Sequence, residues 1–198
     1  ANYSATIALG AQSIAMKITQ EAREENGAWV FVETADTPMG AATDSAIIEK
    51  GSLRLKKRTV KQGPADIALD FSDAAVTGTM TVNGQARPMN IALDGPIFAD
   101  GPGSHAVVAR LPLAAGYTTS FRNVNVQTQK VEVKQLTVAG RESVTVPAGT
   151  FDAWKVEIKG EDGALTTLWV DAASRQVAKI TAVLPAMNGA VLTAQLEK

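Results

Sequence analysis

Three runs near the end of the chain decide its fold: VTVPAGTFDAWKVEI at residues 144–158, TTLWVDAASRQVAKI at 166–180 and GAVLTAQL at 189–196. Apolar and polar residues alternate along much of each run. A period of two is typical of a β-strand with one dry and one wet face. Turn residues separate the runs, so this part of the chain predicts antiparallel strands joined by short connections.

The same alternation extends toward the N-terminus. Turns are predicted at Gly10-Ala11, Asn26-Gly27 and Asn83-Gly84, because Gly and Asn tolerate the positive φ of a tight turn. One helix is predicted, over residues 103–111, between two prolines. About fourteen short strands and one short helix make the chain all-β and mainly antiparallel, and the expected form is a curved open barrel or half-barrel meander.

Length and composition indicate one domain. The chain has 198 residues, of which 45% are hydrophobic, so it can bury a substantial core. No low-complexity linker divides it, and a single β domain over residues 1–198 is expected. The Gly- and Pro-rich stretch at 94–102 is the best candidate for a junction between two halves of its sheet.

Charge and cysteine content narrow the classes of partner. The chain carries 19 basic and 20 acidic residues, so no overall field favours nucleic acid, and no nucleic-acid partner is predicted. No apolar run approaches the roughly 18 residues of a membrane helix. Cysteine is absent, which excludes disulfides and thiolate chemistry. The oligomeric state stays open.

The start of the chain suggests where the protein works. The chain opens within a strand-like run and without an initiator methionine. We therefore expect a mature form from which a signal peptide or a preceding domain has been removed. The predicted location is extracytoplasmic, either periplasmic or secreted.

Few residues suggest catalysis. A zinc site needs three or four ligands, and His105 is the one histidine, so no metal, cofactor or catalytic residue is predicted. Ser104 and His105 would point about 100° apart on a helix, which does not suit a nucleophile and its base. Glu33, Asp152 and Glu157 are candidate carboxylates for a glycosidase, but solvated surface acids are the simpler interpretation.

One basic strand is a candidate anion patch, formed by Arg54, Lys56, Lys57 and Arg58. It could hold a polyanion, a phospholipid headgroup or an acidic partner. The alternative is a strand whose charges face solvent and block pairing between sheet edges. No interleaved aromatic residues support single-stranded nucleic acid as the ligand.

Aromatic and aliphatic strand residues are candidates for a hydrophobic binding surface. Trp154 and Trp169 fall in consecutive predicted strands and could line one surface, although core packing is the default interpretation. The residues proposed for such a concave surface are Trp29, Phe31, Trp154, Val156, Ile158 and Trp169.

Three motifs carry a family resemblance. They are VPAGTFDAWKV at 146–156, LWVDAASRQV at 168–177 and, less closely, LPLAAGY at 111–117. Together they resemble a family of uncharacterised bacterial secreted β proteins, a domain of unknown function whose architecture is similar to the periplasmic lipoprotein carriers. The resemblance covers roughly the second half of the chain. It implies a sheet curved into an incomplete barrel, with a helical element over its concave face and an acyl chain between them.

Three functions follow in order of preference. The first is a non-enzymatic extracytoplasmic protein that binds a hydrophobic small molecule, a lipid or an acyl group, in the concave face of the sheet. The second is an accessory or interaction module of a larger secreted or envelope hydrolase, suggested by the abrupt start of the chain. The third is a carboxylate-dependent enzyme such as a glycosidase.

Overall fold

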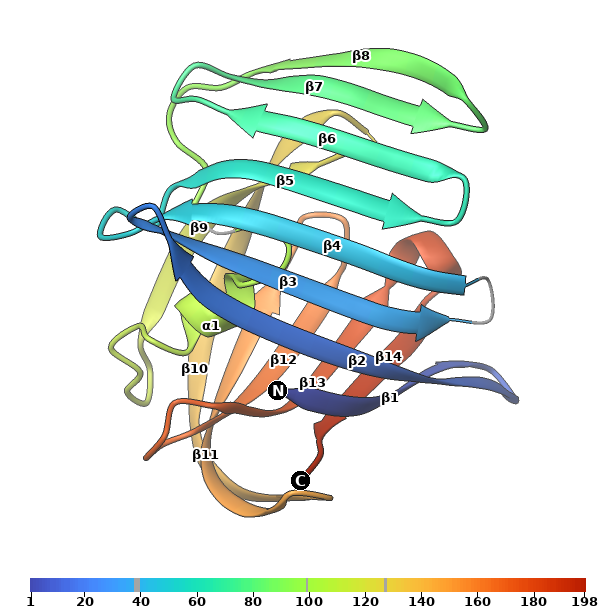
Figure 1. Cartoon of the computed structure of the whole chain (residues 1–198). Coiled ribbons are helices and arrows are strands. Elements are labelled where there is room, and N and C mark those ends of the chain that lie inside the picture. The colour runs from blue at the N-terminus through green and yellow to red at the C-terminus, as the bar shows by residue number, and fades with distance from the viewer. Residues whose placement is uncertain (38–39, 99, 127) are drawn as a thin grey trace. The chain divides into compact units, whose positions relative to one another are not determined.

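The computed structural model describes residues 1–37, 40–98, 100–126 and 128–198 (Figure 1). In this part of the chain strands dominate, with one short α-helix and one 3₁₀ turn. The strands are β1 (Asn2–Leu9), β2 (Gln12–Glu25), β3 (Ala28–Thr37), β4 (Gly40–Glu49), β5 (Leu55–Gln62), β6 (Ala65–Phe71), β7 (Ala75–Val82), β8 (Gln85–Ala92), β9 (Thr118–Asn125), β10 (Lys130–Val146), β11 (Gly149–Lys159), β12 (Leu165–Asp171), β13 (Val177–Leu184) and β14 (Ala190–Leu196). The helical elements are α1 (Ser104–Val108) and η1 (Pro185–Met187).

All fourteen of these strands belong to one antiparallel sheet. Their order is β8-β7-β6-β5-β4-β3-β2-β1-β14-β13-β12-β11-β10-β9, so the sheet ends at β8 and β9 and is not closed into a barrel. The prediction of an all-β, antiparallel, open sheet with one short helix is confirmed. Among the described residues, no helix has the length and apolarity needed to span a bilayer.

The helix is shorter than the predicted 103–111. It ends at Val108, and the backbone N–H groups of Arg110 and Leu111 bond to carbonyls only three residues earlier. Pro112 follows directly. A proline disfavours the α conformation in the residue before it, which accounts for a tightened last turn in place of continued helix.

The chain forms two compact units whose segments alternate along the sequence. The first consists of Ala1–Ile18, His105–Phe121 and Val133–Lys198, and the second of Thr19–Ser104 and Arg122–Glu132. The chain passes from the second unit to the first just after the predicted junction at 94–102. The short segment Arg122–Glu132 belongs to the second unit although the residues on either side of it belong to the first, and nothing in the sequence indicates this.

The first unit has its core on one face of β10 to β14 and β1. One row of cross-strand partners forms the centre of this face, and every member is at most 5% exposed: Val138, Val156, Leu168, Ile180, Ala194 and Ala5. The opposite face carries a row of threonines, Thr167, Thr181, Thr193 and Thr6. Thr167 is buried at 6% exposure, but the other three threonines keep exposed surface, so the alternation read from residues 144–196 does separate a dry face from a wetter one.

The second unit contains β3 to β8, which pair in chain order. Asn83 and Gly84 have φ values of 51° and 78°, the left-handed pair that a two-residue hairpin turn requires, and they join β7 to β8 as predicted. Gly78 in β7 allows a close approach, because a Cβ there would lie 2.0 Å from the carbonyl oxygen of Ala68 in β6. Any larger residue at this position would push the two strands apart.

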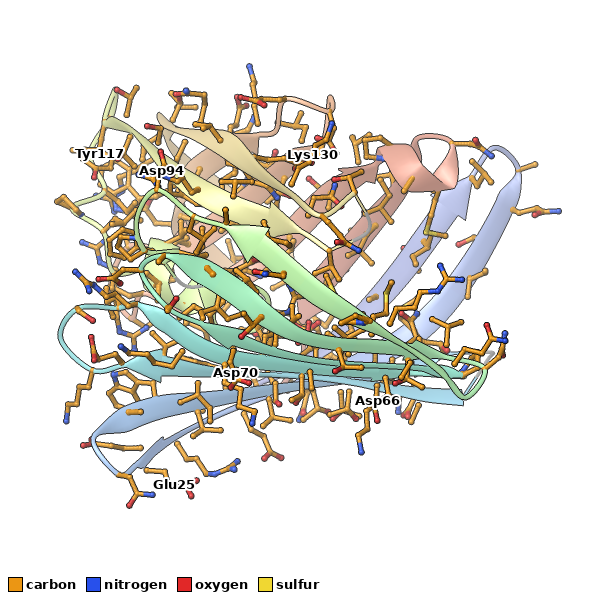
Figure 2. The ribbon with its side chains drawn as sticks, turned by 90° about the horizontal axis from the view of Figure 1, so that it is seen from above. Glu25, Asp66, Asp70, Asp94, Tyr117 and Lys130 are labelled. Carbon is orange, nitrogen blue, oxygen red and sulfur yellow. The ribbon has the colours of Figure 1, made fainter. Side chains whose placement is uncertain are left out.

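Residues 94–98 and 100–103, which we together call the strap, cross one face of the second unit's sheet. The Ile97 side chain is 1% exposed, and its carbonyl accepts a hydrogen bond of 2.9 Å from the N–H of Leu55. We call the face beneath the strap the covered face. Asp66 and Asp70 lie together on the opposite face, as alternation along β6 requires and Figure 2 shows.

Candidate functional site

Three rows of side chains run across β3 to β8 on the covered face of the second unit. Each row consists of direct cross-strand partners, whose side chains share one face of a sheet. The first row is Phe31, Ala46, Arg58, Leu69, Gly78 and Met89; the second is Glu33, Asp44, Val60, Ile67, Met80 and Arg87; the third is Ala35, Ala42, Gln62, Ala65, Val82 and Gln85.

The first row lies beneath the strap. A Cβ on Gly103 would sit 2.4 Å from the ring of Phe31, and one on Gly101 would sit 2.5 Å from Nε of Arg58. Only glycine lets the strap backbone come this close. Ala46 and Leu69 in the same row are fully buried. The first row is therefore part of the core.

Arg58 holds the strap through two carboxylates. Its Nη2 lies 2.7 Å from Oδ2 of Asp44, and its Nη1 lies 3.6 Å from Oδ1 of Asp100 in the strap. The Asp100 carboxylate also accepts hydrogen bonds from the side-chain amide of Asn123 and from the backbone N–H of Val124. This cluster fixes the strap to β4, β5 and β9 with charge-assisted bonds.

The environment of Asp44 is unfavourable for its charge. Burial raises the pKa of its carboxyl group, the hydrogen bond and charge of Arg58 oppose that rise, and the nearby Glu33 and Asp100 add to it. Since Glu33 is also the cross-strand partner of Asp44, two acids stand side by side in the second row. Arg58 is what makes this arrangement tolerable.

The middle of the second row is apolar and only half-buried. Val60, Ile67 and Met80, which we call the apolar strip, each retain part of their surface, in contrast to Leu69 one row closer to the strap. The third row beside them contains three alanines, two glutamines and Val82, which is 39% exposed. In β6 and β7 the exposed apolar surface of the strip continues onto Ala65 and Val82, and an apolar molecule could lie on it.

The basic strand does not form a single patch. Lys57 faces away from the strap with Asp70, whereas Arg58 lies on the covered face. Each of the four cations has an acidic partner; the distances are 2.9 Å for Arg54 to Asp73, 3.2 Å for Lys56 to Glu49, 3.9 Å for Lys57 to Asp70 and 2.7 Å for Arg58 to Asp44. The four cations are thus paired within the protein, and β5 lies between β4 and β6, so their charges do not protect a sheet edge as the alternative interpretation proposed.

The tryptophans predicted to line a concavity each have a cation over the ring. Lys50 lies 5.5 Å from the ring centroid of Trp29, Arg141 lies 5.2 Å from that of Trp154 and Lys179 lies 4.8 Å from that of Trp169. Cation–π contact of this kind occupies one face of each indole. Only the other face of each ring is left for a ligand.

Trp154 and Trp169 do not share a surface. Trp154 is paired with Val170 and Trp169 with Lys155, so the two indoles point to opposite faces of the β11–β12 ladder. The indole N–H of Trp169 donates to Glu142 at 2.6 Å. The two tryptophans are fifteen positions apart, and the odd offset could only be converted into faces once the turn between them was known.

The other predicted ligand residues belong to the packed interior. Val156 is fully buried and Ile158 is 7% exposed, both in the first unit, and Gly103 lies against the ring of Phe31. No bound molecule tests their predicted contact with a ligand, which stays a prediction. Because these residues are buried, the apolar strip is the better candidate for a ligand surface, and the sequence did not lead us to predict it.

A signal for part of the strip was present in the sequence. A two-residue turn at Asn83-Gly84 fixes the register of β7 and β8, so the pairing of Met80 with Arg87 could have been predicted. The position of the strap could not, because nothing in residues 94–103 indicates which row it covers.

The candidate carboxylates have structural partners. Arg141 binds Asp152 through Nε and Nη2, Glu157 lies 3.8 Å from the ammonium group of Lys155, and Glu33 accepts a hydrogen bond of 2.7 Å from Gln20. Within the described part of the chain, no group of three or more His, Asp or Glu side chains is placed to hold a metal ion.

The comparisons with known proteins identify a family. A family model, described as a protein of unknown function (DUF3108), matches residues 2–195. The chain belongs to DUF3108. No curated protein and no solved structure matches it. The resemblance to an all-β domain of unknown function is thereby confirmed, and the DUF3108 match spans both compact units. Since the description of DUF3108 carries no activity, function is argued from geometry.

Proposed function

We propose that this DUF3108 protein binds a hydrophobic ligand, a lipid or an acyl chain, on the apolar strip of the second unit. The observation that carries the proposal is the change in burial between neighbouring rows. Leu69, in the first row, is fully buried, whereas Ile67, in the second row of the same strand, keeps exposed surface.

Physical reasoning supports an apolar ligand at this position. Removing apolar surface from water stabilises a complex by roughly 25 cal/mol per Å². The strip spans β5, β6 and β7, and neighbouring strands lie about 4.8 Å apart, so an extended chain across it contacts three apolar side chains in succession.

A substitution in the strip tests the proposal. Met80→Asp puts a charge where the chain would lie, and Thr79→Asp puts the same charge on the opposite face of β7. Binding of oleyl alcohol, an uncharged long-chain ligand, is followed by displacement of the dye Nile red. We expect Met80→Asp to weaken binding at least about tenfold, because the ligand would have to desolvate a carboxylate.

Thr79→Asp should bind like the wild type. Failure of the wild-type protein to bind oleyl alcohol or Nile red would end the proposal. So would equal affinities for the two variants, because binding would then not depend on the apolar strip.

A further inference from the structure

Arg87 stands at one end of the second row, on the same face as the apolar strip. Its direct partner across the β7–β8 hairpin is Met80. The residue is exposed, and it forms no ion pair with any residue that the structure describes. The basic residues of β5, by contrast, all have acidic partners.

The surroundings of Arg87 leave its charge available. Its same-face neighbours in β8 are Gln85 and Met89, and across the hairpin Val82 and Gly78 flank Met80. The acids of the row, Glu33 and Asp44, lie at its far end in β3 and β4, where Gln20 and Arg58 bind them. Asp66, in β6, faces the opposite side with Lys61.

We propose that the ligand is an anionic amphiphile, whose carboxylate or phosphate group binds Arg87 while its chain lies on the apolar strip. This inference rests on the function proposed above and adds the charge and orientation of the ligand. A guanidinium binds carboxylate and phosphate oxygens through two parallel N–H groups, which suits either headgroup. The amide of Gln85 in the neighbouring row adds a further donor.

The second row then determines in which direction the ligand lies across the strands. The head lies at β8, and the chain runs over Met80 and Ile67 toward Val60, a distance of three strand spacings or about 14 Å. The acidic far end of the row disfavours the reverse orientation, since an anionic head would there approach Glu33 and Asp44. An amphiphile is therefore held in one direction by charge and in place by apolar contact.

Paired ligands and paired variants test the inference. Oleate and oleyl alcohol share one chain and differ in head charge, so the wild-type protein should bind oleate about three to ten times more tightly at low salt. Arg87→Ala should remove this preference and leave the affinity for oleyl alcohol unchanged. Lys61→Ala removes an exposed cation from the opposite face of the same sheet and should keep the preference.

Each outcome has a distinct meaning. Failure of the wild-type protein to bind oleyl alcohol overturns the proposed function itself. Equal binding of both ligands by the wild type and by Arg87→Ala keeps that function and overturns the role of Arg87. A preference that Arg87→Ala retains, or that Lys61→Ala also abolishes, overturns it as well, because the charge effect would then be diffuse.

A second arm distinguishes the two sources of the anion. The protein is incubated with phosphatidylcholine vesicles containing phosphatidylglycerol, and lipid uptake is measured by native mass spectrometry after the vesicles are removed. Uptake of phosphatidylglycerol that depends on Arg87 identifies a phospholipid headgroup. Binding of oleate without such uptake identifies a free fatty acid. Both results support the shared chemistry, and uptake of phosphatidylcholine and phosphatidylglycerol in equal amounts contradicts it.

Discussion

His105, the one histidine of the chain, is the second residue of α1, the one α-helix among the described residues. Desolvation by burial, together with the charge of Lys134, lowers the pKa of its imidazole to about 4. The ring is thus neutral in the folded protein at pH 5, where an unfolded chain would carry it charged. Among the residues that the structure describes, no side chain is recorded in a hydrogen bond with this ring.

The shift predicts how stability depends on pH. An unfolded histidine titrates near 6.5. As the pH falls from 6.5 toward 4, the unfolded chain gains a proton that the folded protein does not, so the free energy of unfolding falls. We expect His105 to contribute a loss of about 1–2 kcal/mol between pH 7 and pH 5, at the lower end because the residue keeps some exposed surface.

Urea unfolding of the wild type and of His105→Gln, each at pH 7 and pH 5, measures this loss. The glutamine variant lacks the titrating group, so its stability should fall by less over the same interval. Carboxylates contribute equally to both proteins and cancel in the difference. An identical pH dependence of the two proteins would show that His105 is hydrated in the folded state.

The sequence predicted the sheet face on which a residue lies more reliably than it predicted which residues surround it. Alternation correctly placed Val156 and Ile158 on a dry face, because a period of two is a local property. Arg58 looked like one of four equivalent cations, yet it alone lies between two acids, with its side chain only 18% exposed. Asp44 and Asp100 lie far from it in the chain, and only tertiary pairing distinguishes it from Lys57.

At the scale of elements, the strap is held in place within the second unit by several contacts. It is held by an ion pair between Asp94 and Arg122, by the buried side chain of Ile97 and by the Asp100 cluster. Asp100 is 8% exposed at its side chain and accepts bonds from several donors. Its carboxylate connects a segment without regular structure to the strands beneath.

Removing that carboxylate should loosen the strap. Asp100→Ala leaves Arg58 with one acid in place of two and leaves the amide of Asn123 without its acceptor. We expect a loss of about 2–3 kcal/mol in the free energy of unfolding, measured by urea denaturation followed by circular dichroism.

Asp73→Ala is the matched control. Asp73 also pairs with an arginine of this unit, Arg54, but its side chain is 62% exposed. An exposed pair contributes at most about 1 kcal/mol. If the two variants lost equal stability, the Asp100 cluster would be no more than a surface ion pair.

Hairpins were the elements most readily predicted. Asn83-Gly84 determined both the turn and the register, because a two-residue loop with positive φ at both positions leaves one pairing of the flanking strands. The predicted helix was correct in kind but too long at its end. The strap escaped prediction because Gly, Pro and Asp mark it as a connection without indicating what it packs on.

At the scale of the whole molecule, the order of strands adds what local patterns lack. Alternation predicted about fourteen strands and an open sheet, and both hold for the described residues. It did not predict that β1 would pair with β14, which joins the strands β1 to β8 to the strands β9 to β14. Pairing between residues nearly two hundred positions apart leaves no short-range trace.

An open sheet has end strands, and β8 is one of them. Pro88 lies within β8, opposite Thr79 in β7. A proline without an N–H is tolerated in an edge strand where that position faces outward. The outer side of β8 therefore lacks one of the donors that a further strand would require.

Restoring the donor should make the protein self-associate. Pro88→Val adds an N–H and a residue that favours strands, and we expect its mass by light scattering to rise with concentration in the range where the wild type's does not. Ala86→Val makes the same edge more strand-prone without adding an N–H, and it should behave like the wild type. If both variants associated equally, side-chain character and not the missing donor would protect the edge.

Pro88 thus also affects how one copy of the protein interacts with another. A free sheet edge can pair with a strand from another molecule as readily as with a strand from its own chain. Repeated pairing of this kind extends a sheet without limit. One missing hydrogen-bond donor at β8 works against that recruitment. It favours the separate folded protein over assembly into a fibre.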